Sequence, residues 1–326
     1  MNKRTLGQVE VSEQGLGCMG MTFGYAPSGE DEAVATIRRA VEMGITYFDT
    51  ADMYGPYTNE TLLGKALGSD RDNVVVGSKV GNEVVDGQLT WQLNGRPEYI
   101  AASIDGTLQR LGTDHVDLYY LHRVDPQVPV EESVGAMAEL VTAGKVRALG
   151  LSEVGADTLR RAHAVHPISA VQSEYSLVTR DVEELGVTQA TQELGVGLVA
   201  YSPIGRGMLS GSWTVAERGE RDFRHIAPRF NESNLQHNLS LVDRVTDIAG
   251  SMGVTTSQIA IAWVLAQGEH VVALPGTKRV RYLEENIAAS EIELTPEQVA
   301  SISSALDPAE VRGTRYPERE MPVVNA

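Results

Sequence analysis

The chain has 326 residues, and its 44 acidic against 27 basic side chains give a formal net charge of −17. This acidic balance argues against nucleic acid and against an anionic membrane surface as partners. A single cysteine, Cys18, excludes an intrachain disulfide, and no apolar run reaches the ~18 residues that span a bilayer. The start of the chain lacks the apolar segment of a signal peptide, so we expect a cytoplasmic protein.

A short hairpin over residues 3–12 is predicted first, and apolar runs then alternate with helical periodicity. Eight strand–helix alternations favour an α/β fold of the (β/α)8 TIM-barrel type over an open sheet. Because no linker interrupts them, residues 1–326 are expected to form a single domain. The predicted strands are residues 16–21, 46–51, 74–80, 116–122, 146–152, 170–176, 197–203 and 271–277, and the predicted helices are residues 30–43, 59–67, 97–111, 129–143, 157–165, 182–194 and 255–266.

Two segments break this rhythm and are predicted as long loops. Residues 81–96 carry Trp91, and residues 204–238 are rich in arginine, glycine and aromatic side chains, including Trp213, Arg218 and Arg221. Both follow strands, so both are expected at the rim of the barrel that carries active sites. For the second loop a disordered insertion is the alternative. The tail, residues 307–326, is expected to wrap the surface and is a candidate wall of a substrate pocket.

Three predicted strands end in a charged or titratable residue: Asp49, Lys79 and His122, with Tyr54 five residues after Asp49. The ends of parallel barrel strands meet at one rim, so these side chains should converge. An ammonium beside a phenol lowers the phenol's pKa, and a carboxylate holds that ammonium in place. A histidine there can orient a carbonyl oxygen. The set indicates protonation of an oxygen that becomes an alkoxide, although each residue alone also has a purely structural interpretation.

Basic residues follow the last predicted strand. Gly276 and Thr277 precede Lys278, Arg279 and Arg281, a pattern that is typical of an anion site beside a helix start. The alternative is a helix that merely begins with surface cations. Residues 201–207 add an aromatic face and a glycine-rich segment that suits a phosphate.

Two other features of the sequence do not indicate a binding site. Residues 15–20 match G-x-G-x-x-G, but residues 21–29 separate them from any helical pattern, which the dinucleotide fingerprint does not allow. Only one histidine lies in the reactive group, and no His-x-His pair occurs, so no metal is predicted.

Taken in order, these motifs closely resemble the aldo-keto reductases over roughly residues 3–306. The resemblance implies a (β/α)8 barrel that reduces aldehydes and ketones with NADPH. It looks most like the branch of bacterial and plant enzymes that act on varied carbonyl compounds. The matching stretches are Gly44 to Gly55, Ser78-Lys79, Asp117 to His122, Gly150-Leu151-Ser152, Val171-Gln172, Tyr201-Ser202-Pro203, and Leu274 to Asn286.

The resemblance also implies roles for individual residues. Tyr54 looks like the general acid, Lys79 and Asp49 like its tuners, and His122 like the residue that orients the carbonyl. Candidate walls of the substrate pocket, which also includes Tyr54 and His122, are Tyr25, Trp91 and Tyr119. The residues expected to contact NADPH are Gly20, Met21, Asp49, Ser152, Gln172, Tyr201, Ser202, Pro203, Gly205, Arg206, Gly207, Gly276, Thr277, Lys278, Arg279, Glu285 and Asn286.

The chain departs from the family pattern at two places. Glu153 stands where many relatives carry asparagine, and Tyr282 stands where many carry arginine or glutamine near the adenosine. A second hypothesis is an NADPH-binding redox sensor of the potassium-channel β-subunit type. A homo-oligomer is possible on either hypothesis, because the family includes monomers, dimers and octamers.

Overall fold

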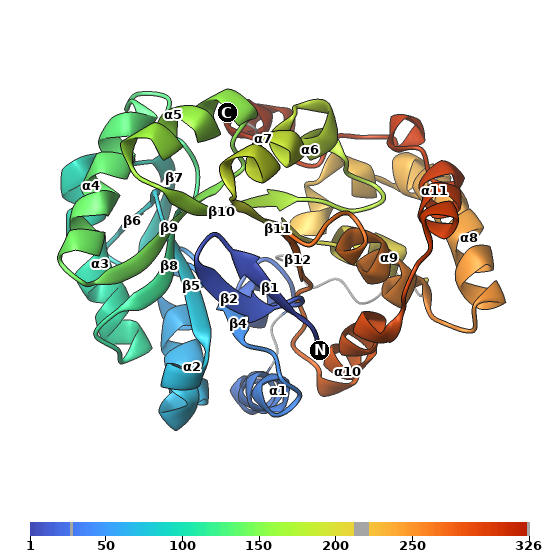
Figure 1. Cartoon of the computed structure of the whole chain (residues 1–326), viewed down its shortest axis with the longest axis horizontal. Helices are drawn as coiled ribbons and strands as arrows, with labels where there is room; N and C mark the ends of the chain where they lie inside the picture. Colours follow the sequence, from blue (N-terminus) through green and yellow to red (C-terminus); the bar gives the residue numbers. More distant parts are fainter. Residues whose placement is uncertain (27–28, 212–221, 325–326) are drawn as a thin grey trace.

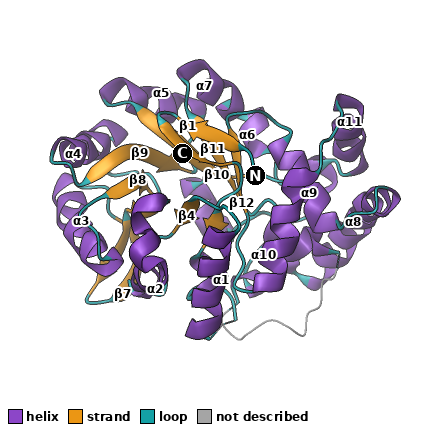
Figure 2. Ribbon diagram, turned by 60° about the horizontal axis from the view of Figure 1, so that its bottom comes forward, coloured by secondary structure: helices purple, strands orange, loops and turns teal. Residues whose placement is uncertain are grey.

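In the computed structural model, residues 1–26, 29–211 and 222–324 are described. Eight parallel strands form one sheet in the order β12-β11-β10-β9-β8-β5-β4-β3, and helices surround it (Figures 1 and 2). The prediction of eight barrel strands is confirmed. The strands are β3 Leu16–Gly17, β4 Tyr47–Asp49, β5 Val75–Val80, β8 Val116–Leu121, β9 Val146–Ser152, β10 Ile168–Glu174, β11 Gly197–Tyr201 and β12 Val271–Leu274.

Two parallel bridges bring the ends of this sheet together. Gln14 pairs with Ala273 and Gly17 pairs with Gly276, and the Gly17 amide donates to the Pro275 carbonyl at 3.1 Å. These bridges close the sheet into the predicted (β/α)8 barrel. A single domain over residues 1–326 stays a prediction.

Aromatic side chains fill the barrel interior. The hydroxyl oxygens of Tyr47 and Tyr120 lie 3.0 Å apart, and both rings are fully buried. Gly150 makes room for them, because a Cβ there would lie 2.3 Å from the Tyr120 ring. Below them, Leu6 and Val11 of the predicted N-terminal hairpin, β1 Lys3–Leu6 and β2 Val9–Ser12, join the same apolar cluster. The hairpin therefore closes the end of the barrel opposite the rim where the strands finish.

Helices cover the outside with one apolar face each. In α3, for example, Ile100, Ile104 and Leu111 are buried and face the strands. The predicted helix over residues 182–194 is wrong, because Gly186, at φ +67°, divides it into α6 and α7. The helices are α1 Glu30–Glu42, α2 Thr58–Leu67, α3 Pro97–Leu111, α4 Val130–Thr142, α5 Ala156–Val165, α6 Asp181–Glu184, α7 Val187–Leu194, α8 Glu232–Ser251, α9 Thr256–Leu265, α10 Val280–Ile287 and α11 Pro296–Ala305.

The two predicted loops are more ordered than expected. Residues 81–96 form a second hairpin, β6 Asn82–Val85 and β7 Gln88–Leu93, whose two-residue turn has positive φ at Asp86 and Gly87. Residues 204–238 contain short 3-10 turns and the start of α8, and their positions 212–221, with Trp213, Arg218 and Arg221, lie outside the described residues.

Across the described ranges, no helix on its own has the length and apolar composition to cross a membrane. Helices α8 and α9 pass that test only when taken together, with a bend of 89° between them.

Candidate active site

The predicted reactive side chains meet at the carboxyl ends of β4, β5 and β8. The Lys79 ammonium, fully buried, lies 2.5 Å from the Asp49 carboxylate and 2.8 Å from the Thr50 carbonyl oxygen. It also lies 3.3 Å from the Tyr54 hydroxyl oxygen. The carboxylate therefore fixes the ammonium, and the ammonium in turn faces the phenol.

His122 completes this group. Its ring meets the Tyr54 ring edge-on, with centroids 5.7 Å apart. Burial, followed by the charges of Lys79 and Arg123, holds the pKa of His122 well below 6.5, so the imidazole is neutral. A neutral imidazole can donate or accept a hydrogen bond at a substrate oxygen without adding charge to the site.

The direction of the Tyr54 pKa differs from the expectation. Burial first, and the Asp49 carboxylate second, raise the pKa of Tyr54 well above 10, so the predicted net lowering is wrong. The Lys79 ammonium at 3.3 Å favours phenolate and opposes that rise. Burial also lowers the pKa of Lys79. Tyr54 consequently keeps its proton near neutral pH and is placed to give it to a stronger base, such as an alkoxide.

Three predicted cofactor residues line the same rim at the ends of β9, β10 and β11. The Gln172 amide donates to the Asp49 carboxylate at 2.8 Å, while Ser152 is buried nearby, with its hydroxyl 3.0 Å from an Arg123 nitrogen. Tyr201 is partly exposed at the end of β11. A hydroxyl, an amide and an aromatic face are groups that a nicotinamide carboxamide and ring require, so these residues fit that half of the cofactor.

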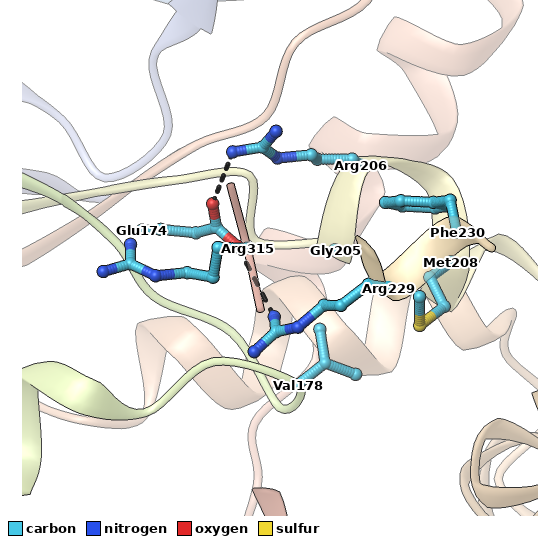
Figure 3. A pocket seen from close by; sticks show the side chains of 8 residues that line it. All are labelled: Glu174, Val178, Gly205, Arg206, Met208, Arg229, Phe230 and Arg315. Carbon is cyan, nitrogen blue, oxygen red and sulfur yellow. Dashed lines mark hydrogen bonds and ion pairs between the residues drawn. The ribbon is translucent and has the colours of Figure 1, made fainter. Parts of the chain in front are cut away.

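The segment after β11 has an unusual backbone. Ser202, Gly205, Arg206 and Gly207 all have positive φ angles, at 52°, 57°, 56° and 91°. In this structure the amides of Gly205 and Gly207 donate to the Ser202 and Ile204 carbonyl oxygens, at 2.8 and 3.1 Å, so the contact of this segment with a pyrophosphate stays a prediction. The Arg206 guanidinium itself bonds the Glu174 carboxylate at 2.8 Å, so in this structure its charge is already paired (Figure 3).

Residues after β12 are the ones predicted to contact the other half of the cofactor. Lys278 and Arg279 lie in the partly exposed link between β12 and α10, and Lys278 donates to the Ala26 carbonyl oxygen. The Thr277 hydroxyl accepts from the Arg279 amide at 3.2 Å. Two cations on one short link fit a phosphate.

The remaining predicted cofactor residues lie in three places. Gly20 and Met21 belong to a 3-10 turn, Met19–Met21, directly after β3. Glu285 accepts from the Thr255 hydroxyl at 2.8 Å, and Asn286 is buried in α10. Their contact with a nucleotide stays a prediction, as does that of Pro203.

Comparison with known proteins identifies the family. The model of the aldo/keto reductase family matches residues 14–307. The chain belongs to this family. It is 42% identical over 319 residues to aldo-keto reductase yakc [NADP(+)] from Schizosaccharomyces pombe, covering 96% of this chain and 94% of that protein. It is 43% identical over 309 residues to the probable aldo-keto reductase 1 of Glycine max, covering 94% of this chain and 89% of that protein.

Solved structures with a similar fold also match this chain. A glycerol dehydrogenase from Gluconobacter oxydans superposes with a TM-score of 0.84 at 26% identity, over 94% of this chain and 96% of that one. A thermostable aldo-keto reductase in complex with the inhibitor epalrestat superposes with a TM-score of 0.75 at 33% identity, over 94% of this chain and all of that one. The prediction of an NADP-dependent oxidoreductase that acts on carbonyl compounds is confirmed at the level of the family.

The substrate walls predicted for this aldo-keto reductase are less well placed. The prediction of Tyr119 as a wall residue is wrong, because its side chain is fully buried on the outer, helix-facing side of β8. Trp91 lies on β7 with 75% of its side chain exposed. Tyr25 is partly buried, and the Arg224 guanidinium lies 5.2 Å from its ring centroid. Phe23, which we did not predict, stacks on Tyr54 with centroids 6.1 Å apart.

Two residues of the C-terminal tail, Arg315 and Tyr316, contact residues at the rim. The Tyr316 hydroxyl lies 2.9 Å from that of Tyr201 and 3.3 Å from an Arg123 nitrogen. Its neighbour Arg315 is buried and bonds the Glu153 carboxylate at 3.0 and 3.2 Å. The tail as a wall of the substrate pocket stays a prediction. Glu153, the departure from the family pattern, anchors the tail.

A small closed space lies beneath this anchor. Arg206 and Arg229 reach Glu174 from two sides, and Arg315 lies beside them (Figure 3). The cavity measures about 10 Å³, which accommodates about one water molecule. Its size and its paired charges indicate a structural role and not a substrate pocket.

Proposed function

We propose that this aldo-keto reductase reduces an aldehyde or ketone to the alcohol, with Tyr54 as the general acid. The observation that carries the proposal is the chain of contacts from Asp49 to the Lys79 ammonium at 2.5 Å and from the ammonium to the Tyr54 hydroxyl at 3.3 Å. NADPH, when bound, supplies a hydride to the carbonyl carbon. Ser152, Gln172 and Tyr201 would hold its nicotinamide end, and Lys278 with Arg279 a phosphate.

The side chains of the protein deliver one proton to the substrate in this proposal. The carbonyl oxygen gains negative charge as the carbon is reduced, and the Tyr54 hydroxyl gives it a proton. The Lys79 ammonium stabilises the phenolate that remains, while Asp49 keeps the ammonium in position. Neutral His122 donates a hydrogen bond that orients the carbonyl oxygen. Phe23 and the Tyr54 ring give the apolar surroundings that exclude water.

Tyr54→Phe tests the acid role. We expect the variant to lose about 10²- to 10⁴-fold in turnover, because one positioned acid contributes about that much, and to keep its affinity for NADPH. NADPH oxidation should be followed with aromatic aldehydes, diketones, sugars and pyridoxal, and cofactor binding by fluorescence titration. Tyr175→Phe is the matched control, since it removes a phenol that bonds Glu183 and leaves the rim intact.

Near-normal turnover of Tyr54→Phe would remove Tyr54 from the acid role. Binding of NADPH by the unmodified protein without reduction of any carbonyl in the panel would contradict the proposed reaction. The cytoplasmic location, the oligomeric state and the preference for NADPH over NADH stay predictions.

A further inference from the structure

Arg123 directly follows His122, and its hydrogen bonds within the described part of the chain go to neutral groups. One terminal nitrogen donates to the His122 carbonyl oxygen at 2.7 Å and to the Ser152 hydroxyl at 3.0 Å. The other donates to the Tyr316 hydroxyl at 3.3 Å. The residue is half-buried and lies at the rim that carries the reactive side chains.

Other buried or partly buried arginines of this chain differ in one respect. Each has a carboxylate that neutralises it, whereas in residues 1–26, 29–211 and 222–324 no carboxylate forms an ion pair with Arg123. The pairs are Arg71 with Asp117 at 2.8 Å, Arg110 with Glu60 at 2.6 Å, Arg206 with Glu174 at 2.8 Å, Arg224 with Asp222 at 2.6 Å, and Arg315 with Glu153 at 3.0 Å.

A cation that has no ion-paired carboxylate at a partly buried site favours an anion, although the Glu153 carboxylate acts on Arg123 from farther away. A guanidinium presents its N–H groups as a planar fork, and a carboxylate is the acceptor that matches that fork with two parallel, charge-assisted bonds. The present partner, the Tyr316 hydroxyl at 3.3 Å, is a neutral acceptor at the long end of hydrogen-bond geometry. An incoming carboxylate would bind the same nitrogens more strongly.

The position of Arg123 limits what that anion is. Arg123 directly follows His122, and its guanidinium donates to the His122 carbonyl oxygen at 2.7 Å, so it lies close to the place where a carbonyl would be reduced. The residues that fit the phosphates of NADPH follow β11 and β12 instead, beyond Ser152 and Tyr201. The anion that reaches Arg123 therefore belongs to the substrate.

We propose that the preferred substrate is a carbonyl compound that also carries a carboxylate, and that Arg123 binds this carboxylate while the carbonyl oxygen faces Tyr54 and His122. This inference rests on the proposed reductase function and adds the class of substrate. Tyr316 forms the adjoining wall, since its hydroxyl contacts both Arg123 and Tyr201.

A matched pair of substrates tests the proposal: 4-carboxybenzaldehyde and the neutral 4-carbamoylbenzaldehyde. We expect the unmodified enzyme to have at least about tenfold higher kcat/KM for the acid. In Arg123→Gln, KM for the acid should rise about 10- to 100-fold, since a hydrogen bond to a charged group contributes about that much, while values for the amide stay within about threefold. Arg123→Lys should retain part of the preference because it keeps the charge.

Arg147→Gln is the control, because it removes a β9 arginine with a 63% exposed side chain that pairs with Asp117 away from the rim. Affinity for NADPH, measured by fluorescence, should not change in any of the three variants. Benzoate binding to the NADPH complex, measured by calorimetry, gives a second readout: the unmodified enzyme should bind benzoate and Arg123→Gln should not.

Three results would overturn the assignment. They are equal kcat/KM for acid and amide in the unmodified enzyme, an equal loss of kcat for both substrates in Arg123→Gln, and weaker NADPH binding in that variant. The second would mean that Arg123 acts through Tyr54, and the third that it acts on the cofactor. Absence of reduction together with Arg123-dependent benzoate binding would contradict the proposed reaction and leave the carboxylate site standing, whereas absence of both would remove both.

Discussion

Tyr54 and His122 are buried side by side, and burial moves their pKa values in opposite directions. It raises that of Tyr54 well above 10 and, with the charges of Lys79 and Arg123, lowers that of His122 well below 6.5. Both groups are neutral between these limits. At the scale of single residues, the site thus holds one phenol proton ready and one imidazole uncharged over a wide range of pH.

The opposite pKa shifts of Tyr54 and His122 determine the expected pH dependence of the reduction. In the proposed mechanism turnover requires the protonated phenol, whose pKa lies above 10, so kcat at saturating substrate should stay level from about pH 6 to 9 and fall only at more alkaline pH. A stopped-flow or steady-state profile of NADPH oxidation checks this. An inflection near pH 6.5 that disappears in His122→Gln would show that the imidazole titrates there, contrary to expectation.

Some of these residues could be predicted from the sequence, and others could not. Asp49, Lys79 and His122 could be predicted because each interrupts or ends an apolar run at the end of a parallel strand. Tyr119 was misassigned because successive side chains of a strand face opposite ways, and here Tyr120 faces the barrel interior and Tyr119 the helices. That no carboxylate of the described residues forms an ion pair with Arg123 depends on contacts in space that no local pattern encodes.

The C-terminal tail shows how an element without regular structure is held in place. Its Arg315 enters a buried site and bonds Glu153, which has a φ of +54° just after β9, and also Asp181 at 3.0 Å in α6. A buried ion pair is costly to break from one side, because the remaining charge has no partner. The tail is therefore tied to the rim by charge and by the Tyr316 contacts.

Arg315→Met should lower the free energy of unfolding by about 3–5 kcal/mol, since it leaves the Glu153 carboxylate buried without this guanidinium. The double variant Arg315→Met/Glu153→Gln should regain most of that loss. Urea unfolding followed by circular dichroism measures both. Arg319→Met is the control because its side chain is 79% exposed. A loss in the double variant as large as in the single would contradict the pairing argument.

Prediction of elements succeeded where apolar patterning dominates. The strands of the barrel, being buried, read as apolar runs, and α3 was placed to the residue by Pro97 and Gly112. The hairpin β6–β7 was missed although Asp86-Gly87 is a favoured two-residue turn, because its strands are half exposed and lack clear alternation. Helix α8 was missed. One reason is that its first turns lie within the segment that was predicted to be a loop.

At the scale of the whole molecule, the net charge is −17. The stability of the fold therefore depends on how its buried carboxylates are paired with cations. Glu174 is the clearest case. Burial alone would raise its pKa, but Arg206, Arg315 and Arg229 hold the pKa of Glu174 at about 2. A group with a depressed pKa stabilises the fold above its ordinary value and loses that contribution as the pH falls toward the folded value.

Acid titration should therefore distinguish Glu174→Gln from the unmodified protein. Between about pH 5 and 2 the stability gap between the two should shrink by roughly 3 kcal/mol, because the ordinary pKa is 4.5 and the folded pKa about 2. Urea unfolding at a series of pH values measures the gap. Glu139→Gln, an exposed change on α4, should show a small gap at every pH. A constant gap for Glu174→Gln would mean that Glu174 is not ionised in the folded protein.

The closure of the barrel also determines when during synthesis the enzyme becomes complete. Asp49, Tyr54, Lys79 and His122 all leave the ribosome within the first 122 residues, but Gln14 and Gly17 find their partners only when Ala273 and Gly276 emerge. Arg315 and Tyr316, which secure the rim, follow later still and beyond the part that matches the family. The nascent chain thus carries its reactive side chains long before it can hold them in register, and the contacts of Arg315 and Tyr316 at the rim form only after that.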